Sequence, residues 1–409
     1  MMKKIYLSIA LLSACASLRA QQYMRVWQGE ESLRIALSDA AQMPVSGGEI
    51  KIGGRGYALS SIDSITIVKT IGIEWNGSSV NVNIPDAAKK DLAVKVEGGH
   101  VTITNNNVSE EMEFVLAGES ANGSLTYNGS YKCKFHLNGV SLTSGTGAAF
   151  DIQCGKRVDL ILADGTQNVL EDGKTGSQKA ALYCKGHLEM QGAGSLSVKG
   201  NCKHAVSTKE YLLLKKNLGT LSIKGAASDA LHVGQYFQMN GGTLTIDENT
   251  MADGIQVDAT SDSADELNGQ ILIKGGTINM TIAHEDCKGI KNGGSEDGKV
   301  ACGNVSITGG TITINAKGNG SRGIQTEANM LIASTDANTN ITITAAGDLC
   351  TQSECADDPH RCMGIKVDKK LTITGGTITV YNTGKKSRGI KATDYLETGG
   401  TVNAVITKG

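Results

Sequence analysis

The sequence predicts an all-β protein, a right-handed parallel β-helix, on the strength of its composition and two internal repeats. Glycine occupies 52 of 409 positions, whereas only 3 prolines and 2 tryptophans are present. Aromatic residues make up 4 % of the chain, so aliphatic side chains must fill the core. A hydrophobic share of 40 % argues against general disorder, and collagen is excluded because glycine shows no three-residue period. The formal net charge of −2 does not suggest a nucleic-acid binder.

The first repeat is a Gly-Gly-Thr turn followed by a short segment in which apolar and polar residues alternate. Clear copies lie at 241–246, 275–280, 309–314, 375–380 and 399–402, and degenerate copies at 194–198 and 219–223. Alternation with a period of two is typical of a β-strand. Glycine suits the corner before each strand, because it adopts positive φ and tolerates close backbone approach.

The second repeat combines a small residue, an aliphatic residue and a polar residue. Its copies begin at 205, 230, 254, 289, 323, 364 and 389, so the steps are 25, 24, 35, 34, 41 and 25 residues. A shortest step near 24 predicts a coil of strands with loops inserted in some turns, whereas a propeller blade needs about 40 to 45 residues. Crossovers between parallel strands are nearly always right-handed, which gives the predicted hand.

Residues 1–20 are expected to be a signal peptide. Lys3 and Lys4 precede an apolar run that ends at Leu12, and this run is shorter than the roughly 20 residues that span a bilayer. Cleavage after Ala20 is one reading, and a lipobox ending at Cys15, with a lipid anchor on that cysteine, is the other. Both predict export to the periplasm, the cell surface or the medium.

Residues 21–74 are expected to form a small β segment, and residues 75–409 the parallel β-helix. Short alternating stretches at 24–27, 32–37 and 65–67 read as strands of the first part. Its expected role is to cap the open end of the helix, because an uncovered sheet edge invites aggregation.

Several segments resemble a family of exported bacterial carbohydrate-binding β-helix proteins over roughly residues 75–409. The segments that carry the resemblance are 137–142, 158–166 with Asn168, 203–206, 225–230 and the Gly-Gly-Thr turns. Residues 24–27 and 61–66 are similar to leaders of exported Bacteroidetes proteins. The resemblance implies a pectate-lyase-like fold, binding to cellulose or polygalacturonate, and bound calcium.

Asp229 and Asp253 are the first candidates for a metal site. They occupy the same place in consecutive copies of the second repeat, which puts them about 4.8 Å apart in a regular stack. Carboxylates that close repel unless one is protonated or a cation lies between them, and calcium takes six to eight oxygen ligands. Asp286 is a third candidate ligand. The alternative is that each Asp hydrogen-bonds to backbone in its turn.

A ladder of basic residues is the candidate ligand-binding surface. It comprises Lys291, Lys366 and Lys391 at the outward place of the second repeat, and Lys288, Arg322 and Arg388 at the adjoining corner. Stacked cations suit an extended polyanion such as a uronic acid polymer, although any outward face is polar. The outward aromatic candidates are few, namely Tyr183, Tyr211, Tyr236 and Tyr381, which favours an acidic glycan over a neutral one.

Cysteine usage fits an oxidising compartment. Cys350, Cys355 and Cys362 lie in the longest insertion, where at least one disulfide is expected, with a zinc site that includes His360 as the alternative. Cys184 with Cys202, and Cys287 with Cys302, are further candidate pairs. Spacing alone does not decide the connectivity.

The predicted function is non-catalytic binding of an acidic polysaccharide outside the cell, with calcium as the candidate cofactor. A β-helix lyase is the enzymatic alternative, with calcium on Asp229 and Asp253 and Lys288 or Lys291 as the base. A surface adhesin or structural stalk is the third reading. Among the familiar catalytic signatures, the sequence contains no nucleophile elbow, P-loop or zincin motif.

Overall fold

The structure is a computed structural model in which the described residues are almost entirely β-strand and turn. It describes residues 23–28, 31–36, 43–52, 54–68, 70–261, 264–335, 338–351, 355 and 359–408. The predicted signal peptide and Cys15 lie outside these residues. Within the described ranges, none of the helices has the length and apolar character that crossing a membrane requires.

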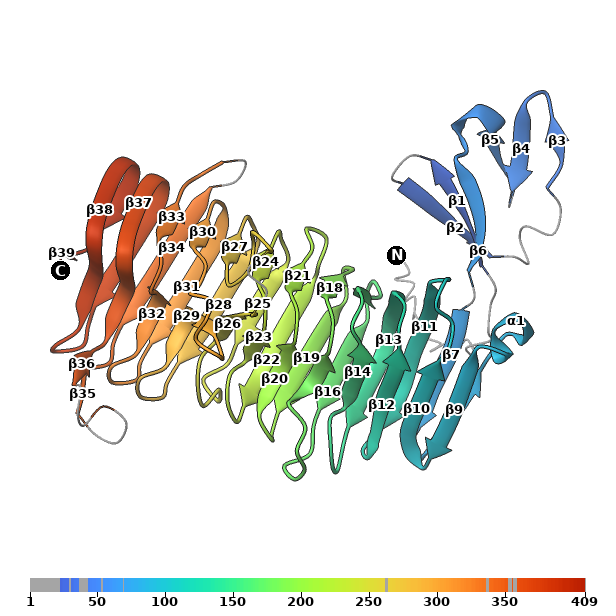
Figure 1. Cartoon of the computed structure of the whole chain (residues 1–409), viewed down its shortest axis with the longest axis horizontal. Helices are drawn as coiled ribbons and strands as arrows, with labels where there is room; N and C mark the ends of the chain where they lie inside the picture. Colours follow the sequence, from blue (N-terminus) through green and yellow to red (C-terminus); the bar gives the residue numbers. More distant parts are fainter. Residues whose placement is uncertain are drawn as a thin grey trace, which may run out of the picture.

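The N-terminal unit consists of two small antiparallel sheets. One has the order β2 (Glu31–Ala36), β1 (Tyr23–Gln28), β6 (Ser64–Val68), and the other the order β3 (Val45–Ser46), β4 (Glu49–Ile52), β5 (Arg55–Ala58), followed by a 3₁₀ turn at Leu59–Ser61. Met24 and Val26 pack with Ile50, Ile52 and Tyr57 in a core separate from that of the rest of the chain. The unit lies beside one end of the molecule (Figure 1).

Residues 70–408 form a long stack of coils, which we call the column (Figure 1). Each coil contributes one strand to each of three rows, and most strands pair in parallel with the third strand along the chain. Row 1 contains β12 (Gly123–Gly129), β14 (Phe150–Cys154), β17 (Ala180–Cys184), β20 (His204–Thr208), β23 (Leu231–Val233), β26 (Ile255–Ala259), β29 (Lys288–Ser295) and β32 (Arg322–Thr326).

The other two rows follow the same pairing rule. Row 2 contains β15 (Val158–Leu162), β18 (Leu188–Gln191), β21 (Leu212–Leu214), β24 (Phe237–Met239), β27 (Ile271–Ile273), β30 (Val305–Ile307) and β33 (Met330–Ile332). Row 3 contains β16 (Gln167–Glu171), β19 (Ser195–Gly200), β22 (Thr220–Ala226), β25 (Thr243–Ile246), β28 (Thr277–Ile282), β31 (Gly310–Ala316) and β34 (Thr339–Ala345).

Long strands and hairpins complete the two ends of the column. β11 (Met112–Ser120) and β13 (Cys133–Thr143) run through rows 2 and 3, β37 (Met363–Asn382) and β38 (Arg388–Asn403) run through all three, and β39 (Ile406–Lys408) ends row 1. The other end has antiparallel pairs, β7 (Thr70–Asn76) with β8 (Ser79–Asn83) and β9 (Leu92–Glu97) with β10 (Gly99–Asn105), with α1 (Asp86–Lys89) between them. A small hairpin, β35 (Leu349–Cys350) with β36 (His360–Arg361), projects from the side.

The column begins earlier than the sequence predicts. β7 already pairs in parallel with β11, so the expected boundary at residue 74 falls inside a strand of the column. Arg25 of β1 forms an ion pair with Glu113 of β11, which joins the N-terminal unit to the column. The capping role of that unit stays a prediction.

Stacked aliphatic side chains fill the column, as the composition predicts. In row 1 the inward ladder runs from Leu182 through Val206, Leu231, Ile255, Ile290, Ile324 and Ile365 to Ile390, and every member is buried. The few phenylalanines gather mainly near the N-terminal end, where Phe114, Phe135 and Phe150 pack with ring centroids 4.9 Å apart in each consecutive pair. Burial of such side chains is the main stabilising contribution, at roughly 25 cal/mol per Å² of apolar surface.

Candidate functional site on row 1

The outward side chains of row 1 form one continuous line along the column. Residues one place after the inward ladder are in register, and they are Asp151, Tyr183, Ser207, His232, Gln256, Lys291, Gln325, Lys366 and Lys391. The alternation of side chains in a strand places all of them on the outer face. The structure thus brings the predicted lysines of the second repeat into one line with Tyr183 and His232.

The corner that leads into row 1 carries a second ladder, to which Asp229 and Asp253 belong. Oδ1 of Asp229 accepts a hydrogen bond from the backbone N–H of Asp253 at 3.1 Å, and Oδ1 of Asp253 accepts one from the N–H of Lys288 at 2.7 Å. Each carboxylate therefore caps the corner of the next coil. This supports the reading in which these residues satisfy turn backbone. Burial outweighs the nearby Lys291 and Lys288 and raises the pKa of Asp253.

Most of the predicted basic residues are paired with carboxylates of neighbouring loops. Lys288 Nζ lies 3.0 Å from Asp286, Lys291 Nζ lies 3.6 Å from Asp253, Arg322 Nη1 lies 3.5 Å from Asp286, and Lys366 Nζ lies 3.1 Å from Asp368. Of the predicted set, only Arg388 and Lys391 have no ion pair within the described part of the chain. The corner ladder is therefore largely neutralised within the protein itself.

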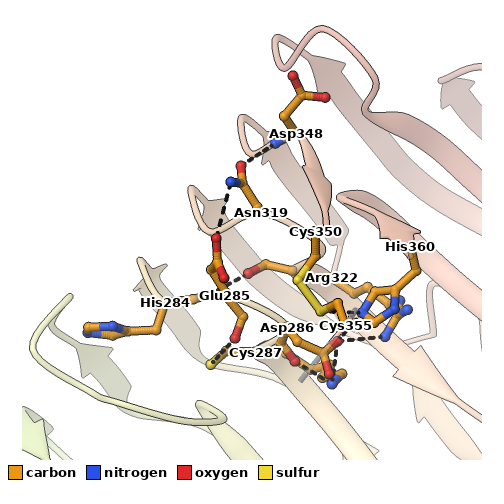
Figure 2. The surroundings of a disulfide bond; sticks show 12 residues. His284, Glu285, Asp286, Cys287, Asn319, Arg322, Asp348, Cys350, Cys355 and His360 are labelled. Atoms are coloured by element: carbon orange, nitrogen blue, oxygen red, sulfur yellow. Dashed lines mark hydrogen bonds and ion pairs between the residues drawn. A yellow bond between two sulfur atoms is a disulfide. The ribbon is translucent and has the colours of Figure 1, made fainter. Parts of the chain in front are cut away.

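Asp286 lies in a cluster of basic side chains beside a disulfide (Figure 2). Lys288, Arg322 and His360 all contact its carboxylate. Burial would raise the pKa of Asp286, but the charge and hydrogen bond of Lys288, together with the contact to His360, hold it below its usual range. Its backbone φ of 53° is the one positive value of a non-glycine residue in the described chain.

The cysteine predictions are partly right. Cys350 and Cys355 form a disulfide with an S–S distance of 2.07 Å, which confirms a bridge in the longest insertion (Figure 2). This bond removes two of the thiolates that a zinc site with His360 would need, and Cys362 is a buried free thiol.

The other two proposed disulfides are wrong, because a strand of the column separates the partners. Cys184 ends β17 and is buried in the core, whereas Cys202 precedes β20 at the opposite edge of row 1. Cys287 precedes β29 and Cys302 follows it. All four cysteines are free.

The three predicted metal ligands do not form a calcium site. Asp229 faces imidazole nitrogens, Asp253 is engaged by a backbone N–H and Lys291, and Asp286 contacts nitrogen atoms of three side chains. Calcium needs six to eight oxygen donors in one place. The donors present around these carboxylates are nitrogen atoms instead, so the residues do not fit calcium.

His204, Asp229 and His232 form a compact cluster that sequence reasoning missed. Oδ2 of Asp229 lies 3.2 Å from Nδ1 of His204 and 3.0 Å from Nδ1 of His232. Burial alone would raise the pKa of Asp229, but its contacts with the two imidazoles hold it well below the usual range. Burial lowers the pKa of His204 despite that partner. The signal was present in the sequence, since His204 and Asp229 share the corner position one coil apart.

Two adjoining hollows run along row 1, and we call them together the row 1 groove. Their volumes are about 660 and 600 Å³. Lys179, Tyr183 and Lys209 border both of them. His204 and His232 line the second hollow, so the cluster described above is open to the groove.

Four lysines around the row 1 groove are exposed, and sequence reasoning missed them. They are Lys179, Lys185, Lys203 and Lys209. Over the residues that the structure describes, none of them pairs with a carboxylate. Lys179 Nζ lies 5.6 Å from the centre of the Tyr183 ring. Lys179 and Lys203 are separated by the shortest step of the second repeat, and so are Lys185 and Lys209. That spacing was the signal from which their alignment could have been predicted.

The outward tyrosines do not form a flat platform. Tyr211 stacks on His187 at 4.5 Å and on Tyr236 at 4.7 Å between ring centroids, so both of its faces are covered. Tyr183 is 9 % exposed in the groove, and Tyr381 is 55 % exposed at the end of row 3. Ring faces that stack along the column are not available to a sugar.

Comparisons with known proteins agree with this architecture. A curated protein of Acetivibrio thermocellus, a carbohydrate-binding domain-containing protein, is 25 % identical over 155 residues, which is 36 % of this chain and 54 % of that relative. The chain thus spans about half the length of the relative it matches. A solved structure, a polysaccharide lyase-like protein from C. thermocellum in a gadolinium derivative, shares the fold with a TM-score of 0.50 at 20 % identity, covering 66 % of this chain and 96 % of that one.

A family model decides the assignment. The model for carbohydrate-binding domain-containing proteins matches residues 97–292 and 279–408, which together cover the column apart from its first strands. The chain belongs to the family of carbohydrate-binding domain-containing proteins.

Proposed function

We propose that this protein binds an acidic polysaccharide, without cleaving it, along the row 1 groove. The observation that carries the proposal is the set of four exposed lysines without carboxylate partners, Lys179, Lys185, Lys203 and Lys209, around two adjoining hollows. The family assignment and the curated relative, a carbohydrate-binding domain-containing protein, support a carbohydrate as the ligand.

The charge pattern supports a uronic acid polymer over a neutral glycan. Lys185 and Lys209 are exposed at equivalent places of consecutive coils, one place after Cys184 and Thr208, which are in register. Repeated cations at the spacing of the coils suit a chain that carries a carboxylate on each sugar, since charge-assisted hydrogen bonds are stronger than neutral ones. Two of the carboxyl groups that line the same hollows accept hydrogen bonds, Asp151 from Gln153 and Asp258 from Gln256, and Glu296 is a third carboxyl group on the second hollow.

The fold itself is proposed to be a right-handed parallel β-helix. Parallel pairing of each strand with the third one along the chain supports the helical path, and the strong preference of parallel crossovers supports the hand. A polymer would then lie lengthwise across several coils. We also propose export of the protein, on the basis of its first 20 residues.

Binding rather than cleavage is favoured by the state of the two candidate bases. Lys288 and Lys291, to which a lyase mechanism would assign proton abstraction, are both ion-paired with aspartates. The carboxylates that would hold calcium for such a mechanism do not fit that ion. We therefore propose that binding needs no calcium. Adding calcium chloride to chelator-treated protein should leave both retention on polygalacturonate and the melting temperature unchanged.

The decisive experiment compares two double variants by affinity electrophoresis in gels that contain polygalacturonate. K185Q/K209Q removes two groove charges, and K216Q/K274Q removes two exposed lysines from turns elsewhere on the column, so the net charge is matched. At about 0.5 kcal/mol for each exposed pair, the groove variant should bind about fivefold more weakly, and the control should bind like the parent.

The same protein distinguishes the alternatives. Fully methyl-esterified pectin should not retain it, because the ligand carboxylates are blocked. A rise in ultraviolet absorbance from 4,5-unsaturated product would show a lyase instead. An equal loss of polygalacturonate binding in both double variants would show that the groove is not the binding site. No retention on any polysaccharide would favour an adhesin or a stalk.

A further inference from the structure

His204, Asp229 and His232 bring three possible metal ligands together beside the second hollow of the row 1 groove, which the two histidines line. Their ligand atoms all lie within 4.8 Å of one another. His204 is 3 % exposed and Asp229 is 8 % exposed, so both are buried, at equivalent corners of two consecutive coils. The imidazole rings are stacked, with centroids 4.2 Å apart and planes 14° apart.

The hydrogen bonds of the cluster leave two acceptor atoms, Nδ1 of His204 and Oδ2 of Asp229, facing each other. Oδ1 of Asp229 already accepts from the N–H of Asp253, so Oδ2 alone faces the imidazoles. The N–H of Asp229 donates to Nδ1 of His204 at 3.3 Å, a bond that requires a lone pair on that nitrogen. Nδ1 and Oδ2 are then two acceptors 3.2 Å apart, a pair that either a proton or a metal ion between them would stabilise.

We propose that His204, Asp229 and His232 bind a divalent first-row transition metal ion of the zinc class through their Nδ1, Oδ2 and Nδ1 atoms. Zinc bonds to nitrogen and carboxylate oxygen are about 2.0 to 2.2 Å long, so neighbouring ligands of a tetrahedral ion are about 3.3 Å apart. The distances of 3.2 and 3.0 Å from Oδ2 to the two nitrogens are close to that value.

A further carboxylate lies where the outer contact of a metal-bound histidine is expected. Oδ2 of Asp258 lies 3.5 Å from Nε2 of His232, and the Gln256 amide donates to Oδ1 of the same carboxylate. A carboxylate on the second ring nitrogen fixes the tautomer in which the first nitrogen coordinates a metal. The His232 side chain is 30 % exposed, so this ring has the room to tilt until both lone pairs converge on the ion.

The donor set selects the class of ion. Two imidazole nitrogens and one carboxylate oxygen suit zinc, cobalt, nickel or copper, whereas calcium requires oxygen donors. Three protein ligands would leave one position of a tetrahedral ion open, and both histidines line the hollow from which it could be filled. Water or a hydroxyl group of a ligand can fill it. This inference stands on the cluster alone and does not depend on the glycan that the groove binds.

The test is a titration of the demetallated full chain with zinc against a chromophoric chelator, followed by the spectrum of the cobalt form. Zinc should bind in one equivalent at the cluster, and cobalt should show d–d bands without a thiolate-to-cobalt charge-transfer band. H232A should weaken zinc binding at least tenfold, and D258N should weaken it about tenfold. H284A is the matched control, since His284 lies outside the cluster and should leave affinity unchanged (Figure 2).

Three results would overturn the proposal. They are a parent protein that binds no zinc, equal losses in H232A and H284A, or a thiolate band, which would assign the ion to a free cysteine. Because His204 is buried and its replacement could disturb folding, the half-exposed His232 and Asp258 carry the test. Circular dichroism of each variant before titration separates a lost site from a lost fold.

Discussion

At the scale of single residues, Asn168 shows how one buried side chain closes a corner of the column. Its Oδ1 accepts from the N–H groups of Gly139 and Val140, both at 2.9 Å. Its Nδ2 donates to the carbonyl of Ser195 at 3.0 Å and to the Thr166 hydroxyl at 3.1 Å. Asn168 is 1 % exposed and Val140 is buried, so water is no ready substitute in the bond between them.

Replacing Asn168 by Ala should therefore lower the free energy of unfolding by about 2 kcal/mol, because it removes four hydrogen bonds and leaves the buried N–H of Val140 without a partner. Urea denaturation followed by circular dichroism measures the change. Asn217→Ala in an exposed turn is the control and should cost less than about 0.5 kcal/mol. Similar midpoints for the two variants would show that the corner does not need the amide.

The candidate site could be predicted at this scale only in part. The register of Lys291, Lys366 and Lys391 follows from the repeat, because residues at equal places in a stack must align. Among the carboxylates that neutralise the ladder, Asp253 has a place in the second repeat, whereas Asp286 and Asp368 have none. For the same reason the lysines that remain unpaired could not be told from those that are paired.

At the scale of elements, glycine corners differ in what they require. Gly192 follows β18 with a φ of +92°, and a Cβ there would lie 2.2 Å from the carbonyl oxygen of Leu162 in the previous coil. Gly165 has a φ of +72°, but a Cβ there would meet no atom within 4 Å. One corner needs glycine for both conformation and space, the other for conformation alone.

Gly165→Ala should cost about 1 kcal/mol, the usual strain of an L-residue at positive φ. Gly192→Ala should cost at least twice as much, because the two coils must also move apart. Thermal and urea unfolding of both variants measure the difference. Equal losses would mean that the backbone at Gly192 relaxes without cost.

The strands themselves were largely predictable, and the exceptions have a physical reason. The Gly-Gly-Thr copies align in row 3, where Thr243, Thr277 and Thr311 are in register. β34 occupies the same row, yet a longer loop rather than Gly-Gly builds its corner, so the repeat gave no sign of it. The N-terminal strands pair antiparallel and lack the repeat, which is why their arrangement could not be foreseen.

At the scale of the whole molecule, a chain with a formal net charge of −2 must attract a polyanion through a local excess of positive charge. Such attraction is screened over about 10 Å at 0.1 M salt and about 3 Å at 1 M. Retention of the parent on polygalacturonate should therefore fall steeply as salt is raised. K185Q/K209Q should show a shallower dependence than K216Q/K274Q, and parallel salt curves would place the contacts elsewhere.

The pairing of strands from coil to coil also has a mechanical consequence. The backbone hydrogen bonds that join neighbouring coils run along the long axis of the column (Figure 1). A pull along that axis loads the bonds of one coil boundary at a time, so the column should yield by peeling from an end. A polymer lying lengthwise in the row 1 groove crosses several of these boundaries. The bound polymer would link neighbouring coils to one another. The force needed to unfold the protein should therefore rise when the groove is filled.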